Sequence, residues 1–571
     1  MDDFTWMIGG EAGFGIMTTG LTFSKIATRS GYHIFDYVEY PSLIRGGHNA
    51  YEVHVADREI RHLAPIINIL VCLNKETFNK HKDRLSSESY VVFDPEDFTP
   101  EGNFKKVMVP LKKILSDLKG QAVMKNMIAL SASLAVAGGD LSLLTNMIKK
   151  EFARKGEEVV TFNKKFAEIG YSHVKTSYPD VKSWLTKTQN PTPQLVLTGN
   201  DAFSLSSIVA DSCFYSAYPM TPSSSVLTTL AAWADRTGMV VRHAEDEISV
   251  INTALGASWA GVRSAVGTSG GGFALMVETV SLSGVTEIPI VIFLSQRPGP
   301  ATGMPTWTEQ GDLLFAVHAG HGEFPKIVLA PGTVEEMIEL TAEAFNLADV
   351  YQTPVIVMSD MYLSEGHKSV SKKFIDDFIA GYKVNRGKTI DKVDGDKYLR
   401  YQLTEDGISP RLIPGVPGHF YQANSYEHLE DGHSTEEAAP RVAQVDKRAK
   451  KLKTYLERDF KSPEIIGDQT SAEIIFVSWG SNKGAILEAQ RQLKEKGRQS
   501  AFIHFSYVYP LAREKITALF RKDKNYVLVE NNSTGQFGTL LRSETGIEIN
   551  KKILRYDGRP ITAEYIISNL K

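Results

Sequence analysis

Short apolar runs alternate with longer amphipathic segments over the first third of the chain. Apolar runs predict strands at residues 4–8, 34–38, 51–55, 67–73 and 90–94. Segments with apolar residues three or four apart predict helices at residues 16–30 and 124–137. Because strands that alternate with helices build sheets covered by those helices, this region is predicted to be an α/β domain.

The same alternation returns twice further along the chain. Strands are predicted at residues 194–198, 213–217, 240–243, 265–268, 288–294, 326–329 and 354–359, with helices between them. This pattern is typical of a largely parallel sheet buried on both faces. Shorter strand signals at residues 473–478, 500–505 and 526–530 predict a third α/β domain. The fold class is therefore α/β and multi-domain.

Two stretches lack this alternation. Residues 187–194 are polar and contain two prolines, which indicates an interdomain linker. Residues 366–470 are charged and broken by glycine and proline, apart from a basic helix near residues 442–459. This second stretch is either an arm that contacts a partner or a solvated linker. The predicted limits are 1–185 for the first domain, 186–194 for the linker, 195–370 for the central domain, 371–470 for the arm and 471–571 for the last domain.

Composition narrows the classes of protein. A chain of 571 residues is too long for one hydrophobic core. The net charge of -4 argues against a nucleic-acid-binding protein, and no apolar run is long enough to cross a membrane. The first residues lack the basic and then apolar order of a signal peptide, so we expect a cytoplasmic protein. Two cysteines are too few for an iron–sulfur cluster, which usually needs four thiolates.

Four loops rich in proline, glycine or acidic residues follow predicted strands of the central domain. They span residues 218–224, 245–247, 268–272 and 297–303. Proline fixes the backbone and glycine frees it, so these loops are shaped for particular conformations. Since ligands of open α/β sheets bind at the carboxyl ends of strands, these loops form the candidate site.

The acidic run at residues 245–247 has two interpretations. Apolar residues three or four apart predict the buried face of the following helix: Ile248, Ile251, Leu255 and Trp259. Glu247 borders that face. The run is either an ordinary acidic helix start, favoured by the helix dipole, or it provides a half-buried carboxylate that shares a proton with a ligand nitrogen.

Near the amino terminus, a predicted strand, a glycine loop and a helix follow one another. This order offers backbone N–H groups to a phosphate, but it also fits a tight turn. The glycines are Gly10, Gly13 and Gly15, a spacing that fits the dinucleotide pattern G-x-G-x-x-G poorly. In the glycine-rich loop at residues 40–49, Arg45 either contacts an anion or lies in a solvated connection.

The four central loops resemble, in order, motifs of one enzyme family. Tyr218-Pro219-Met220-Thr221-Pro222-Ser223-Ser224, the acidic helix start, Thr268-Ser269-Gly270 and the Arg297-Pro298-Gly299-Pro300-Ala301-Thr302-Gly303 loop are similar to those of the α subunit of the 2-oxoacid:ferredoxin oxidoreductases. Met220 and Ala301 stand where the family has Ile and Ser. The resemblance is closest over residues 199–360 and covers most of the chain.

The resemblance implies a fold and a set of roles. Residues 1–185 are expected to form a γ-type domain that acts as a lid, residues 195–370 a transketolase-like thiamine diphosphate pyrimidine domain, and residues 471–571 its C-terminal α/β companion. Glu247 would bind N1′ of the aminopyrimidine and Thr221 would lie near the reacting carbon. Arg297 and Thr306 would hold the substrate carboxylate. Contacts to thiamine diphosphate are expected from Tyr218, Pro219, Thr268, Ser269 and Gly270, and contacts to coenzyme A from Gly10, Gly13, Gly15 and Arg45.

The family pattern also implies what this chain needs from others. A thiamine diphosphate site usually includes a Gly-Asp-Gly and a downstream Asn for magnesium and pyrophosphate, and the sequence has no such motif. A β subunit would bring the Mg²⁺ site and a [4Fe–4S] cluster, in an (αβ)₂ assembly that reduces ferredoxin, with coenzyme A as co-substrate. No metal site is expected in this chain, because no ligand pattern surrounds His318 and His321.

The fused γ–α arrangement looks most like that of the 2-oxoglutarate enzymes. Pyruvate or a broad range of 2-oxo acids remains the alternative substrate. Two other functions stay open on the sequence: a nicotinamide-dependent dehydrogenase that uses the amino-terminal glycine loop, and a non-catalytic assembly subunit built on the same fold.

Overall fold

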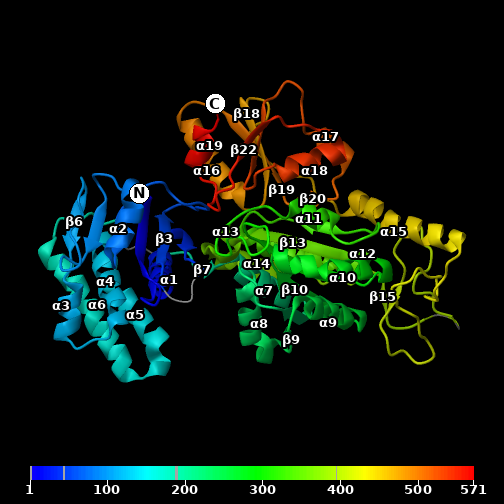
Figure 1. The fold of residues 1–571 in the computed structure, drawn as a ribbon, viewed down its shortest axis with the longest axis horizontal. Helices are drawn as coiled ribbons and strands as arrows, with labels where there is room; N and C mark the ends of the chain where they lie inside the picture. Colours follow the sequence, from blue (N-terminus) through cyan, green and yellow to red (C-terminus); the bar gives the residue numbers. More distant parts are fainter. Residues whose placement is uncertain (1–2, 43–45, 187–190, 394, 396, 571) are drawn as a thin grey trace. The chain divides into compact units, whose positions relative to one another are not determined.

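A computed structural model describes residues 3–42, 46–186, 191–393, 395 and 397–570. It divides the chain into two compact units. The first comprises residues 1–197 and 365–376, and the second comprises residues 198–364 and 377–571. Figure 1 colours the chain from blue at the amino terminus to red at the carboxyl terminus. Among the described residues, no helix is both long and apolar enough to span a bilayer.

The first unit contains a mixed sheet of eight strands in the order β6-β5-β4-β1-β3-β2-β14-β7. The strands are β1 (Phe4–Glu11), β2 (His33–Glu39), β3 (His48–Ala56), β4 (Ile69–Cys72), β5 (Tyr90–Phe93), β6 (Lys105–Met108), β7 (Gln194–Leu197) and β14 (Lys368–Ser371). The helices are α1 (Ile16–Arg29), α2 (Lys75–His81), α3 (Leu111–Asp117), α4 (Lys125–Ala137), α5 (Leu141–Phe152) and α6 (Glu157–Ser177). Helix α4 is buried almost throughout, because it packs between the sheet and α6.

Strand β7 corrects one expectation. The sequence analysis assigned residues 194–198 to the first strand of the central sheet. Instead β7 pairs with β14, which pairs with β2, so both strands extend the amino-terminal sheet. Residues 194–197 are mostly half-buried, as expected for an edge strand. The hydrophobic pattern of a short edge strand does not specify its partner, since pairing is decided by tertiary contacts.

The second unit is built on a seven-stranded sheet in the order β20-β12-β13-β11-β10-β8-β9. The strands are β8 (Ser212–Ala217), β9 (Val240–His243), β10 (Arg263–Thr268), β11 (Ile290–Gln296), β12 (Ile327–Leu329), β13 (Pro354–Asp360) and β20 (Tyr507–Tyr509). All neighbours are parallel except β12 and β20. Every residue of β10, β11 and β13 is buried, which confirms the predicted parallel sheet covered on both faces.

Helices connect these parallel strands. They are α7 (Gly199–Val209), α8 (Ser224–Thr237), α9 (Glu247–Trp259), α10 (Gly270–Thr286), α11 (Leu313–His318), α12 (Val334–Tyr351) and α13 (Met361–Glu365). A capping box between Thr198 and Asp201 starts α7.

The carboxyl-terminal domain has its own sheet in the order β17-β19-β18-β21-β22. Its strands are β17 (Glu464–Ile466), β18 (Ile474–Trp479), β19 (Ser500–Phe505), β21 (Tyr526–Glu530) and β22 (Lys551–Leu554), and its helices are α16 (Lys483–Glu495), α17 (Arg513–Thr517), α18 (Gln536–Thr545) and α19 (Ala563–Ser568). Strand β20 of this domain pairs with β12 at the edge of the central sheet, and α18 packs against α11 (Figure 1).

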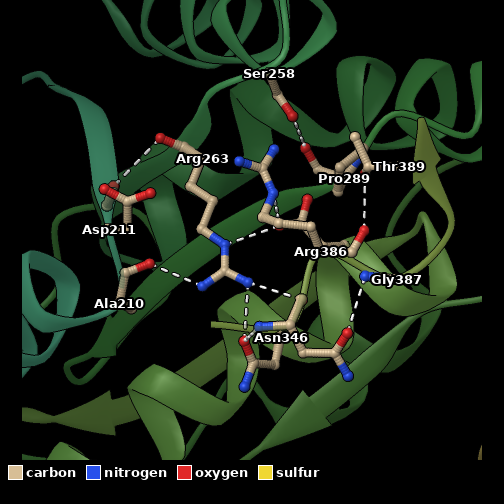
Figure 2. A network of polar contacts seen from close by, with 12 residues as sticks. Ala210, Asp211, Ser258, Arg263, Pro289, Asn346, Arg386, Gly387 and Thr389 are labelled. Carbon is tan, nitrogen blue, oxygen red and sulfur yellow. Dashed lines mark hydrogen bonds and ion pairs between the residues drawn. The ribbon is translucent and has the colours of Figure 1, made fainter. Parts of the chain in front are cut away.

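The arm that connects these domains is anchored on the central sheet. It includes α14 (Lys372–Gly381), α15 (Ala438–Arg458) and the short pair β15 (Thr389–Ile390) and β16 (Arg411–Leu412). Figure 2 shows Arg263 of β10 donating to Ala210 and Asn346, with Arg386 of the arm beside it. Asp349 of α12 forms ion pairs through Oδ2 with Arg263 Nε at 2.8 Å and with Arg386 Nε at 2.7 Å. These buried contacts contradict the alternative of a solvated linker.

Candidate active site

The four loops singled out in the sequence lie along one edge of the central sheet. Strands β8, β9, β10 and β11 run parallel, and the register pairs Ala217 with His243, Gly267 with Ala217, and Thr268 with Leu294. Their carboxyl ends therefore meet at the same edge, and each end leads directly into one of the loops. This arrangement is the one in which open α/β sheets bind ligands.

Glu247 is the buried member of the acidic run. Asp246 caps α9 by accepting a hydrogen bond from the Ser249 N–H at 2.8 Å, and both Asp246 and Glu245 are exposed. The Glu247 side chain is only 4% exposed. The run thus begins the helix in the ordinary way and also supplies one buried carboxylate.

The predicted apolar face of α9 is wrong in part. Ile251 and Leu255 are buried, but Ile248 is 51% and Trp259 40% exposed. The buried stripe starts at Glu247 itself and continues through residues three, four, seven, eight and eleven positions later: Val250, Ile251, Ala254, Leu255 and Ser258. Because small and polar residues occupy this stripe, hydrophobicity alone placed the buried face one position too far along the helix.

The Glu247 carboxylate packs against the start of α10. A β-carbon on Gly272 would stand 2.5 Å from Glu247 Oε1 and would also overlap the Thr268 hydroxyl. Oε1 is buried and has no hydrogen-bond partner among the described residues, and the same holds for the hydroxyl of Ser269, the N-cap of α10. An unpaired buried polar atom costs about 1–3 kcal/mol, so this arrangement suits a ligand that donates a hydrogen bond to Oε1.

The loop after β8 is held from both sides. Asn200 of α7 donates to the Pro222 carbonyl at 2.7 Å and to the Ser225 hydroxyl at 2.7 Å. Arg297 Nη1 donates to the Thr221 carbonyl at 2.6 Å, which joins two residues predicted from separate motifs. Tyr218 and Pro219 are exposed on the same loop.

The loop after β11 folds back on itself. The Met304 N–H donates to the Pro298 carbonyl at 3.0 Å, and Gly303 has a φ of 54°. A β-carbon on Gly303 would overlap that carbonyl, so only glycine fits this turn. Arg297 at the start of the loop is half-buried, and Thr306 after it is 4% exposed.

The sequence analysis missed two neighbouring carboxyl groups, Asp312 beside Arg297 and Glu309 beside Asp312. The Asp312 carboxylate approaches Gly270 so closely that a β-carbon there would overlap it. Burial raises the pKa of Asp312 to about 6, although the charge of Arg297 opposes the shift. Burial and the charge of Asp312 raise the pKa of Glu309 to about 7. The polar run between Thr306 and the apolar helix α11 was the sequence signal for both.

The predicted coenzyme A residues lie in the first unit. Gly13 and Gly15 have φ values of 95° and 71°, so both need glycine. Gly15 packs against Asn126, which donates to the Phe14 carbonyl, whereas nothing lies within 4 Å of a β-carbon on Gly13. Gly10 is still inside β1, paired with Asn49. Arg45 lies outside the described residues.

Comparisons with known proteins agree with this arrangement. The family model described as pyruvate ferredoxin/flavodoxin oxidoreductase matches residues 5–173, and the model of the thiamine diphosphate-binding region of the pyruvate flavodoxin/ferredoxin oxidoreductases matches residues 206–447. The 2-oxoacid:ferredoxin oxidoreductase subunit alpha of Saccharolobus solfataricus is 33% identical, over 99% of this chain and 97% of its own. The chain belongs to the 2-oxoacid:ferredoxin oxidoreductase α subunits.

Two further relatives carry narrower names. The 2-oxoglutarate oxidoreductase subunit KorA of Mycobacterium tuberculosis is 28% identical, over 95% of this chain and 87% of its own. The structure of 2-oxoglutarate:ferredoxin oxidoreductase from Magnetococcus marinus, with 2-oxoglutarate, coenzyme A and succinyl-CoA bound, matches with a TM-score of 0.93 at 31% identity and covers 100% of this chain and 99% of that one. The family resemblance, the multi-domain α/β fold and the oxidoreductase class predicted from the sequence are therefore confirmed.

Proposed function

We propose that this α subunit catalyses the reversible, coenzyme A-dependent oxidative decarboxylation of 2-oxoglutarate, together with a β subunit and with ferredoxin as electron acceptor. The observation that carries the proposal is the buried Glu247 carboxylate with its unpaired Oε1 beside Gly272. The choice of 2-oxoglutarate is supported by likeness to two relatives named for that substrate.

The residues around Glu247 fit the aminopyrimidine ring of thiamine diphosphate. Bound thiamine diphosphate supplies the carbon nucleophile and the electron sink that decarboxylation needs. In this chain Glu247 Oε1 would accept the hydrogen bond from N1′, where a carboxylate favours protonation of the ring. Because Gly272 has no side chain, nothing at that position blocks Glu247 Oε1 from the ring. Thr268, Ser269 and Gly270 would line the ring. Tyr218 and Pro219, which are exposed, would border the outer side of the ring.

Arg297 and Thr306 would bind the substrate carboxylate. One Arg297 nitrogen already donates to Thr221, which fixes the guanidinium and leaves its other N–H groups for a planar carboxylate. Because Thr221 is tied to the same guanidinium, a carboxylate held there would bring the adjacent carbonyl carbon towards Thr221. Thr306, buried at the end of the loop, would add a hydroxyl donor.

The site needs a second polypeptide. The sequence has neither the Gly-Asp-Gly motif for magnesium and pyrophosphate nor the four thiolates for a cluster. Of its two cysteines, Cys72 is buried and Cys213 is exposed. We propose that the β subunit binds Mg²⁺ and the pyrophosphate, carries a [4Fe–4S] cluster that passes electrons to ferredoxin, and forms an (αβ)₂ assembly.

Coenzyme A would bind the first unit at the loop between β1 and α1. The register pairs Glu11 with His48, so this loop starts at the end of the sheet where β3 begins. Gly13 offers backbone without a side chain, which suits the approach of a phosphate. Gly10 and Gly15 would shape that turn, and Arg45 would pair with an anionic group of the coenzyme.

The deciding experiment compares two single substitutions in the enzyme purified with its β subunit. Glu247→Gln keeps the shape of the side chain but removes its charge, and should lower 2-oxoglutarate-dependent reduction of ferredoxin at least about 10²-fold. Glu245→Gln, two residues away and exposed, is the matched control and should stay within about twofold. Assays with pyruvate and 2-oxobutyrate test the substrate. Full activity of Glu247→Gln would refute the role of Glu247.

A further inference from the structure

The segment between Thr306 and α11 is held by turns of the carboxyl-terminal domain. The Thr308 N–H donates to the Gly558 carbonyl at 3.2 Å, and the Gly311 carbonyl accepts from Gln536 Nε2 at 2.6 Å. The Leu314 N–H donates to Gln536 Oε1 at 2.9 Å. These bonds reach residues far away in sequence, so the segment owes its path to the other domain.

Gln310 is the centre of these contacts and is 0% exposed. Its Oε1 accepts from Asn482 Nδ2 at 2.7 Å and from the Asn531 N–H at 3.0 Å, while its Nε2 donates to the Trp479 carbonyl at 3.1 Å. Its own N–H donates to the Asn531 carbonyl at 2.7 Å, and its carbonyl accepts from Asn532 Nδ2 at 3.1 Å. Five hydrogen bonds thus tie one residue to two turns of the carboxyl-terminal domain.

The position of Gln310 in the chain gives these contacts a functional meaning. Gln310 lies four residues after Thr306 and two before Asp312, whose carboxylate packs against Gly270. The loop preceding it is exposed from Pro300 to Met304, whereas Thr306 and Thr308 at its far end are buried. The fixed end of the substrate loop is therefore the end that Gln310 holds.

A stacked pair supports the same end of the loop. The guanidinium of Arg559 lies 3.3 Å from the centroid of the Trp307 ring, and Asn531 Nδ2 donates to the Arg559 carbonyl at 3.0 Å. Thr308 Oγ1 also donates to the buried Asp360 at 3.2 Å, and Asp360 accepts from Ser481 at 2.5 Å. The residues on both sides of Gln310 therefore contact the carboxyl-terminal domain or the end of β13.

We infer that Gln310 is a positioning residue for substrate binding: through it the carboxyl-terminal domain holds Thr306 and Asp312 in the geometry that receives the 2-oxo acid. The inference rests on the proposed role of Thr306. Gln310 itself is buried and contacts no substrate. Loss of Gln310 should therefore weaken the binding of the 2-oxo acid. It should not affect the binding of coenzyme A, which is proposed for the first unit.

The test uses the complete enzyme and substitutes, one at a time, the two residues of the Gln310–Asn482 hydrogen bond. Gln310→Ala removes all three side-chain hydrogen bonds, and the milder Asn482→Ala removes one of the two donors to Gln310 Oε1. Each should raise KM for 2-oxoglutarate at least about fivefold while KM for coenzyme A stays within about twofold. If Gln310→Ala does not fold, Asn482→Ala decides.

Glu336→Gln is the matched control. Glu336 of α12 pairs with Lys483 and lies 3.2 Å from His504 Nε2, so it joins the same two domains through contacts that do not include Gln310. It should lower the melting temperature but leave KM for 2-oxoglutarate unchanged. An equal rise in KM in Glu336→Gln, or an unchanged KM in folded Gln310→Ala or Asn482→Ala, would overturn the inference.

Thr306→Val separates this inference from the proposed function. A raised KM in Thr306→Val with an unchanged KM in the Gln310 and Asn482 variants refutes only the positioning role. An unchanged KM in Thr306→Val refutes the substrate role of Thr306, and the positioning role with it.

Discussion

Glu247 and Gly272 fit together so closely that any side chain at residue 272 would displace the Glu247 carboxylate. A β-carbon there would stand 2.5 Å from Glu247 Oε1, inside van der Waals contact. The buried carboxylate of α9 and the glycine start of α10 therefore form one structural unit at the carboxyl ends of β9 and β10. The third glycine of the run is a requirement of the carboxylate, which gives the motif a physical reason.

The first prediction uses this contact. Gly272→Ala should displace the Glu247 carboxylate and lower activity of the complete enzyme at least about tenfold, since small displacements of reacting groups are costly. Gly271→Ala is the control, because its β-carbon would meet only the Ala301 carbonyl, at 3.8 Å. Equal activities of the two variants would show that the contact is unimportant. Ferredoxin reduction and bound thiamine diphosphate are the measurements.

The second prediction concerns pH. Burial raises the pKa of Asp312 to about 6 and that of Glu309 to about 7. Both groups become charged as the pH rises from about 5.5 to about 8, and the negative charge of Asp312 beside Arg297 then repels a substrate carboxylate. KM for the 2-oxo acid should therefore rise across this window. Asp312→Asn should lower KM at about pH 8 by roughly fivefold, equivalent to about 1 kcal/mol, and change little at about pH 5.5.

The stability of the folded protein should also depend on pH through Asp312 and Glu309. A carboxyl group whose folded pKa is raised contributes stability that is complete below its unfolded value, near pH 4, and that is lost as the pH rises through about 6 to 7. Asp312→Asn should therefore flatten the dependence of the melting temperature on pH in this window. An unchanged pH profile of both KM and melting temperature in Asp312→Asn would contradict this prediction.

The third prediction concerns the anchor of the arm. Asp349 is 3% exposed and pairs with Arg263, Arg386 and Arg411. Asp349→Ala leaves buried arginines without a counter-charge and should lower the free energy of unfolding by about 3–5 kcal/mol. Glu495→Ala removes an exposed partner of Arg491 and should cost no more than about 0.5 kcal/mol. Chemical unfolding of both variants is the measurement, and equal losses would contradict the prediction.

The fourth prediction tests the coenzyme A loop. Gly13 and Gly156 both have positive φ, 95° and 101°, and a β-carbon at either meets nothing within 4 Å. Alanine at either position therefore causes similar backbone strain. Gly13→Ala should raise KM for coenzyme A by about tenfold because the methyl group intrudes where the phosphate would approach, whereas Gly156→Ala should not. A similar KM in both variants would remove the loop from coenzyme binding.

The layered α/β fold and the order of the site loops follow from local sequence patterns. The apolar runs of β11 and β13 predict strands that are buried on both faces, and both strands are buried throughout. The proline and glycine of the loops mark turns that few other residues allow. Local chemistry therefore placed Glu247, Thr221 and Arg297 at strand ends without any knowledge of the tertiary contacts.

The contacts between distant residues, in contrast, could be read only from the folded chain. The Glu247 carboxylate packs against Gly272 of α10, close to Thr268 at the end of β10, and Arg297 donates to a carbonyl 76 residues earlier. The assignment of β7 and β14 to the first sheet, and the grip of the carboxyl-terminal domain on Gln310, join residues far apart in the chain. Such contacts are set by packing between elements that are distant in the sequence, which no local pattern of hydrophobic and polar residues encodes.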